Sequence, residues 1–166
     1  MSPLDRLALW LGRVLSVVFL LIALMLGWEV VVRYLFAAPT YWAHELAGIL
    51  AAFAFVFGGA YCMAEGSHMR ISLLLERLGP RGRKAVEIVS LLAGAIYLAG
   101  LTWAAWRMTE GSFLRFTDEG QWMAERSGSS WNTPAPAFVK LALLLGGGLF
   151  LLVLLRQLLR TLRSKA

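Results

Sequence analysis

The sequence predicts an all-α membrane protein with four transmembrane helices and both termini in the cytoplasm. Apolar residues make up 59% of the chain and charged residues only 16%, where soluble domains usually carry about a quarter charged residues. Several charge-free apolar runs approach the roughly 20 residues that cross a bilayer core. Eleven of the sixteen Lys and Arg residues fall on the side that carries both termini, which places that side in the cytoplasm by the positive-inside rule.

We expect a single four-helix domain over residues 1–166, with helices at about residues 7–34, 41–63, 85–106 and 137–155. The first apolar run is longer than a signal-peptide core and lacks a small-residue cleavage pattern, so it is interpreted as a retained helix. Pro39 ends it, because proline cannot continue a helix. The net charge of +6 comes from residues at the ends of apolar runs and near the C-terminus, a distribution that favours anionic lipid as the partner and gives no reason to expect nucleic acid.

The connection at residues 64–84 alternates leucines with charged residues and ends at Gly79 and Pro80. A short amphipathic helix lying on the membrane surface fits this pattern. An ordinary loop with one helical turn fits it equally well. Both interpretations remain open at this point.

Small residues mark the expected contact faces of the third and fourth helices. Gly94 and Gly100 lie on one, and Gly146, Gly147 and Gly148 lie in the middle of the other. In lipid, small residues let helix backbones approach closely and pack. We therefore expect these two faces to pack against each other or against a partner.

Charged and aromatic residues gather where the first two helices meet. Glu29 and Arg33 are four residues apart and can pair on one helix face, and Glu45 opens the second helix. We predict an ion-paired cluster of these three residues that fixes the corner. The alternative is that Glu29 or Glu45 carries protons, because an intramembrane acid is by default a functional candidate. Trp42 is interpreted as an interface anchor or packing residue.

The two histidines do not predict a haem site. His44 and His68 lie at opposite ends of the second helix, about 36 Å apart at 1.5 Å per residue, and neither has a histidine partner. No metal, nucleophile–base or phosphate-binding motif is visible. We therefore expect no cofactor and no enzymatic activity. The middle of the second, third and fourth helices carries only small hydroxyls as polar groups, which speaks against a transport pathway through this chain.

One set of motifs resembles a known family. It runs through Arg33-Tyr-Leu-Phe36, Pro39, Trp42-x-x-Glu45, Gly58-Gly59 and Gly66-Ser-His68-Met-Arg70. Their order and spacing resemble the small membrane subunit, also called the DctQ-type subunit, of tripartite ATP-independent periplasmic (TRAP) transporters. The four-helix layout and the chain length agree. Ala37 and Ala38 depart from the pattern, since many relatives carry asparagine near the proline.

The resemblance implies a small inner-membrane scaffold subunit of a secondary transporter. Such systems import organic acids or related solutes with an ion gradient, usually sodium. A periplasmic binding protein delivers the solute and a large membrane subunit carries the transport sites. The candidate structural or partner-interface residues are Glu29, Arg33, Trp42, Glu45, Gly58, Gly59, His68, Arg70, Gly94, Gly100, Gly146, Gly147 and Gly148.

Two other functions are left open. One is a stand-alone small proton-coupled exporter, which a carboxylate in the middle of a spanning helix would favour. The other is the membrane anchor of a redox complex, which histidines on facing helices would favour.

Overall fold

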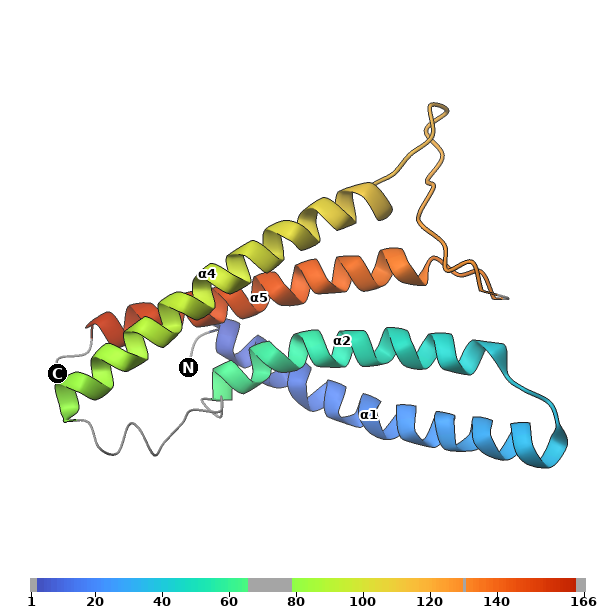
Figure 1. Cartoon of the computed structure of the whole chain (residues 1–166), viewed down its shortest axis with the longest axis horizontal. Coiled ribbons are helices and arrows are strands. Elements are labelled where there is room, and N and C mark those ends of the chain that lie inside the picture. Colours follow the sequence, from blue (N-terminus) through green and yellow to red (C-terminus); the bar gives the residue numbers. More distant parts are fainter. Residues whose placement is uncertain (1–2, 66–78, 130, 164–166) are drawn as a thin grey trace.

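The computed structural model describes residues 3–65, 79–129 and 131–163, and these residues are mostly helical (Figure 1). Within them, four helices are long and apolar enough to cross a membrane. They are α1 (Pro3–Phe36), α2 (Tyr41–Glu65), α4 (Pro80–Ser112) and α5 (Ala135–Arg163). The prediction of an all-α protein with four spanning helices is confirmed. The cytoplasmic placement of the termini stays a prediction. Most of the expected interfacial segment, together with His68 and Arg70, lies outside the described residues.

The helices run further than the sequence predicted. The third expected helix, at residues 85–106, is observed as Pro80–Ser112, and the fourth extends to Arg163 rather than to residue 155. The predicted ends lie at the first charged residues, Lys84, Arg107 and Arg156. Long charged side chains at a helix end can reach the lipid headgroups while the helix continues. At 33 residues, α4 is about 50 Å long and outreaches a hydrocarbon core of about 30 Å.

The four helices form an open arrangement with α2 and α5 at its centre. α4 packs against α5, α5 packs against α2, and α2 packs against α1, while α1 also meets α5. Among these described helices, α4 has no neighbour besides α5. The two edge helices, α1 and α4, therefore expose most of their apolar surface.

The helices come together at the end where α1 begins and α5 ends, here called the terminal end (Figure 1). One buried apolar cluster there draws on all four helices. Its members are Ala8, Ala60, Met63, Leu91, Ala95, Leu98, Val153, Leu154 and Leu158. The opposite end, here called the loop end, carries the short α1–α2 connection and the loop of residues 113–134.

A buried acid ties the terminal end together. Asp5, in the first turn of α1, is 5% exposed. Its Oδ2 accepts hydrogen bonds from Arg156 Nη1 at 3.2 Å and Arg160 Nη2 at 3.1 Å. These contacts join the start of the chain to its last helix, and the sequence analysis did not anticipate them.

The glycines expected to pack divide into two groups. A Cβ on Gly146 would overlap Val56 of α2, and one on Gly94 would lie 3.1 Å from Leu154 Cδ1. A Cβ on Gly147 would lie 3.3 Å from Thr102 Oγ1, and one on Gly59 would lie 3.0 Å from the Phe150 ring. In contrast, a Cβ on Gly58, Gly100 or Gly148 would meet no atom within 4 Å. The first group therefore sets the distances between the chain's own helices, and the second does not.

Alanine substitutions at Gly146 and Gly148 test this division. We expect Gly146→Ala to lower the free energy of unfolding by about 1–3 kcal/mol, because overpacking forces helices apart and the branched Val56 side chain has little rotamer freedom to yield. Gly148→Ala has open space and should be neutral or slightly stabilising, by up to about 1 kcal/mol. Denaturation by SDS in mixed micelles measures both. Equal losses in the two variants would contradict the assigned packing.

Candidate functional site

Polar side chains of the loop end gather around three carboxylates. Glu29 belongs to α1, Glu45 to α2 and Glu125 to the 113–134 loop. Each carboxylate has its own set of partners within the chain. Together they connect the helices where these lie furthest from the apolar cluster of the terminal end.

The first cluster joins α1 to α2. Arg33 donates to Glu29 Oε1 from Nε at 2.9 Å and from Nη2 at 2.5 Å. His44 of α2 places its Nδ1 3.9 Å from the same oxygen. The i, i+4 spacing puts Glu29 and Arg33 on one helix face. Glu29 is 2% exposed, so the guanidinium compensates a charge that has left water.

The second cluster ties α2 to the long loop. Glu45 accepts hydrogen bonds from the Ser129 hydroxyl, at 2.5 Å, and from the Thr133 hydroxyl. The predicted three-residue ion cluster is therefore wrong for Glu45, which pairs with the loop and not with Arg33. His44 and Glu45 are adjacent on the helix and point about 100° apart, so only one of them can face α1.

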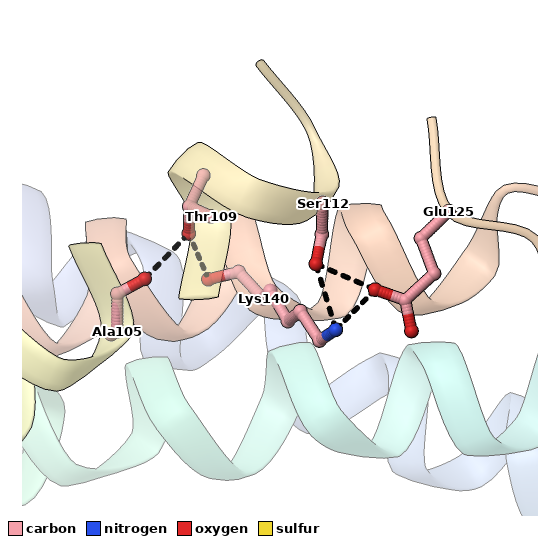
Figure 2. Close-up of polar contacts among 5 residues, drawn as sticks. All are labelled: Ala105, Thr109, Ser112, Glu125 and Lys140. Atoms are coloured by element: carbon pink, nitrogen blue, oxygen red, sulfur yellow. Dashed lines mark hydrogen bonds and ion pairs between the residues drawn. The ribbon is translucent and has the colours of Figure 1, made fainter. Parts of the chain in front are cut away.

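The third cluster connects α4, α5 and the 113–134 loop (Figure 2). Ser112 Oγ donates to Glu125 Oε2 at 2.5 Å, and Lys140 Nζ donates to Ser112 Oγ at 2.8 Å and pairs with Glu125. The Glu125 amide donates to the Ser112 carbonyl at 2.9 Å. One turn earlier, the Thr109 hydroxyl lies 2.8 Å from the carbonyl of Ala105 and 3.1 Å from that of Lys140.

Aromatic rings support the same part of the loop. The rings of Phe113, Trp122 and Phe138 meet edge to face, with centroids 5.4–6.3 Å apart. The Trp122 indole donates to the Phe113 carbonyl at 2.7 Å. Gly120, at φ 78°, takes the left-handed conformation that turns the chain back, for which glycine carries no steric penalty. The loop is thus a shaped element fixed to α5.

The sequence profile of one protein family matches residues 22–164, nearly the whole of the chain. The family is described as the DctQ component of tripartite ATP-independent periplasmic transporters. The chain belongs to this family. A search of curated proteins gave no match. The resemblance inferred from the hairpin motifs is confirmed, and the protein is the small membrane subunit of a TRAP transporter, a multi-pass protein of the bacterial inner membrane.

The Ser112–Lys140 contact of this DctQ-type subunit has the reach of a nucleophile and its base. Its surroundings do not suit that chemistry. The Lys140 ammonium group pairs with the Glu125 carboxylate and donates to Ser112, and an ammonium group has three donors and no lone pair to accept a proton. Ser112 is 4% exposed and its hydroxyl is directed at Glu125. The arrangement holds the loop against the two helices.

No group of three or more His, Cys, Asp or Glu side chains among the described residues of the subunit could hold a metal ion. The partner-interface roles of Trp42, Gly58, Gly100 and Gly148 stay predictions. The three glycines have open space at their Cβ positions, and Trp42 is exposed in the first turn of α2, three residues before Glu45. Sequence reasoning missed Ser112, Glu125 and Lys140. No local sequence pattern predicts that cluster, because its three members come from α4, the 113–134 loop and α5.

We expect the Arg33 guanidinium to contribute more to the free energy of unfolding than a partly exposed side chain usually does. Arg33→Ala leaves the Glu29 carboxylate buried without its main partner, and breaking such a pair costs about 3 kcal/mol. The double change Glu29→Gln, Arg33→Gln should cost less, because two neutral amides can pair. Denaturation by SDS in mixed micelles compares the free energies of unfolding.

Arg107→Ala is the matched control, since Arg107 lies 3.7 Å from Glu110 in an exposed pair of similar spacing. Exposed pairs contribute at most about 1 kcal/mol. An Arg33→Ala variant as stable as Arg107→Ala would refute the assigned role of Glu29.

Acid should loosen the loop through Glu125. Hydrogen bonds from Lys140 and Ser112 lower the pKa of the Glu125 carboxyl below its ordinary value of 4.5. A lowered pKa in the folded state gives stability that is present above pH 4.5 and is lost as the pH falls through the folded value. We expect amide exchange at Glu125, corrected for intrinsic rates, to rise on acidification below about pH 4.5. Glu125→Gln should show the faster exchange at neutral pH already. Wild-type exchange that is unchanged down to pH 3 would count against the anchor.

Proposed function

We propose that this subunit is a scaffold that binds neither the transported solute nor the coupling ion. In this proposal it holds the large membrane subunit of the transporter in the bilayer. That subunit imports an organic acid or related solute with an ion gradient, most simply of sodium, and a periplasmic binding protein delivers the solute. The assignment of these tasks to partner chains rests on membership of the DctQ family, whose members are components of such complexes.

The proposal rests mainly on one observation: acidic side chains of the spanning helices form hydrogen bonds or ion pairs within the chain. Asp5 is held by two arginines, Glu29 by Arg33, and Glu45 by two hydroxyls. Each lies near a helix end. A coupling residue must exchange its ion or proton with partners along a pathway, usually within the membrane. Carboxylates that lie near helix ends and are paired within the chain are better suited to hold the helices in place.

The exposed apolar surface supports the same proposal. Along α1, large apolar side chains such as Leu20, Leu24 and Trp28 are mostly exposed, and α4 shows the same at Ile96 and Trp103. A chain with an enclosed transport pathway would be expected to wrap its helices around it. The open arrangement instead presents its surface outward, to lipid and to other chains.

The two alternative functions find less support. A proton-coupled exporter needs a titrating acid in the middle of the membrane, and the acids of α1 and α2 lie near helix ends with partners. A redox anchor with haem needs histidines on facing helices, and His44 instead approaches Glu29.

Reconstitution tests the proposal directly. Liposomes containing this chain alone, with a sodium gradient and the binding protein, should show no uptake above empty liposomes. Liposomes containing the chain and the large subunit should show uptake. In the complex, Glu29→Gln and Glu45→Gln should leave the sodium dependence and the substrate affinity unchanged. Uptake by the chain alone, or an altered sodium dependence in either variant, would overturn the scaffold assignment.

A further inference from the structure

The edge helix α4 exposes two faces that differ in composition. One face carries the bulky side chains of Val89, Leu92, Ile96 and Trp103. The other carries exposed small residues around one larger side chain, Tyr97. The members of this second face, here called the Tyr97 face, are Ser90, Ala93, Tyr97, Gly100 and Ala104.

Helical geometry separates the Tyr97 face from the contact with α5. At about 100° per residue, the five members fall within about 80° around the helix. The buried residues that join the cluster with α5, such as Leu91 and Leu98, lie about 100° or more from Tyr97. Gly94, which approaches Leu154 of α5, and Leu101, which is partly buried against the cluster, lie about 60° and 40° from Tyr97 and mark the border of the α5 contact. A Cβ on Gly100 would meet no atom within 4 Å. None of the helices that the structure describes covers the Tyr97 face.

Tyr97 lies at the centre of the charge-free segment of residues 88–106, about 13 Å along the axis from either end. The side chain is 70% exposed, and no hydrogen bond from the described residues reaches its hydroxyl. The expectation that this segment carries only small hydroxyls is therefore wrong at Tyr97. Tyrosines exposed to lipid favour the headgroup level, where the hydroxyl is wet. At mid-depth the hydrocarbon offers no acceptor, and an unsatisfied polar group is costly there.

We propose that the Tyr97 face docks a transmembrane helix of the large subunit, which supplies a hydrogen-bond acceptor at the depth of Tyr97. This inference rests on the proposed scaffold function. Small residues let a partner backbone approach closely, and interhelical hydrogen bonds add to the packing. The bulky face of α4 then remains towards lipid, where large apolar side chains are well solvated.

Other occupants fit less well. Lipid chains leave the hydroxyl unpaired, and a periplasmic protein does not reach the middle of the bilayer. A two-fold contact between copies of this chain would let one Tyr97 donate to the other. The second hydroxyl proton would stay unpaired, because the face has no other acceptor at that depth.

Two alanine-to-leucine changes test which face docks. Ala104 lies on the Tyr97 face, and Ala99 is exposed on the other side of the same helix. We expect Ala104→Leu to reduce the amount of large subunit that copurifies with the tagged chain by about fivefold or more, since overpacking a close contact is costly. Ala99→Leu should leave recovery unchanged. Equal recovery in both variants, or a loss in Ala99→Leu alone, would overturn the assignment.

Tyr97 itself supplies a second test that does not depend on recovery. Tyr97→Phe removes only the hydroxyl and should weaken the complex by about threefold, the usual size of an interhelical hydrogen bond in membranes. In a Cys62→Ala background, Tyr97→Cys should form crosslinks to the large subunit with a short thiol-reactive crosslinker. Crosslinks between two copies of this chain, or to no protein at all, would show that a second copy or lipid covers the face.

The wild-type chain separates this inference from the proposed function. If the large subunit does not copurify with the wild type, the scaffold assignment fails. If it copurifies equally with wild type, Ala104→Leu and Tyr97→Phe, the scaffold assignment stands and the Tyr97 face is refuted.

Discussion

Hydrocarbon offers no hydrogen-bond partner, and this constraint accounts for the placement of polar groups in the protein. The four described helices satisfy their backbone groups internally, and charged side chains are moved to the helix ends. Asp5 meets two arginines at one end, whereas Glu29, Glu45 and Glu125 find partners at the other. The ion pairs and hydrogen bonds at both ends then hold helices whose middle sections attract one another only through close contact.

The two ends are held in different ways. At the terminal end, a compact apolar cluster and the Asp5 contacts bring all four helices together. At the loop end, side-chain hydrogen bonds through the 113–134 loop act together with the aromatic rings of Phe113, Trp122 and Phe138. Glu45 fixes one side of that loop to α2, and Glu125 fixes the other side to α4 and α5. The loop therefore adds connections between α2, α4 and α5 at the loop end, beside direct helix contacts such as that of Thr109 with the Lys140 carbonyl.

Most of the fold could be predicted from the sequence, because length and charge-free runs are sufficient to define spanning helices. The Glu29–Arg33 pair was also predictable, since both residues lie on one helix at a fixed spacing. Contacts such as Glu45 with Ser129 and Thr133 were not, because they depend on how a 22-residue connection folds back over the helices. The role of Tyr97 was overlooked for another reason. Its environment depends on which side of α4 faces α5, and an apolar run without strong periodicity does not reveal that side.

The arrangement of neighbours also determines which helices can pair before the others are present. α1 and α2 follow each other in the chain and pack together, so they can form a hairpin as soon as α2 has been made. The only described neighbour of α4 is α5, which follows it in the chain after the long 113–134 loop. Until α5 is inserted, α4 therefore lacks the one described helix of this chain that it packs against. The α1–α2 hairpin can therefore form from adjacent segments of the chain, whereas α4 is joined to that hairpin only through α5.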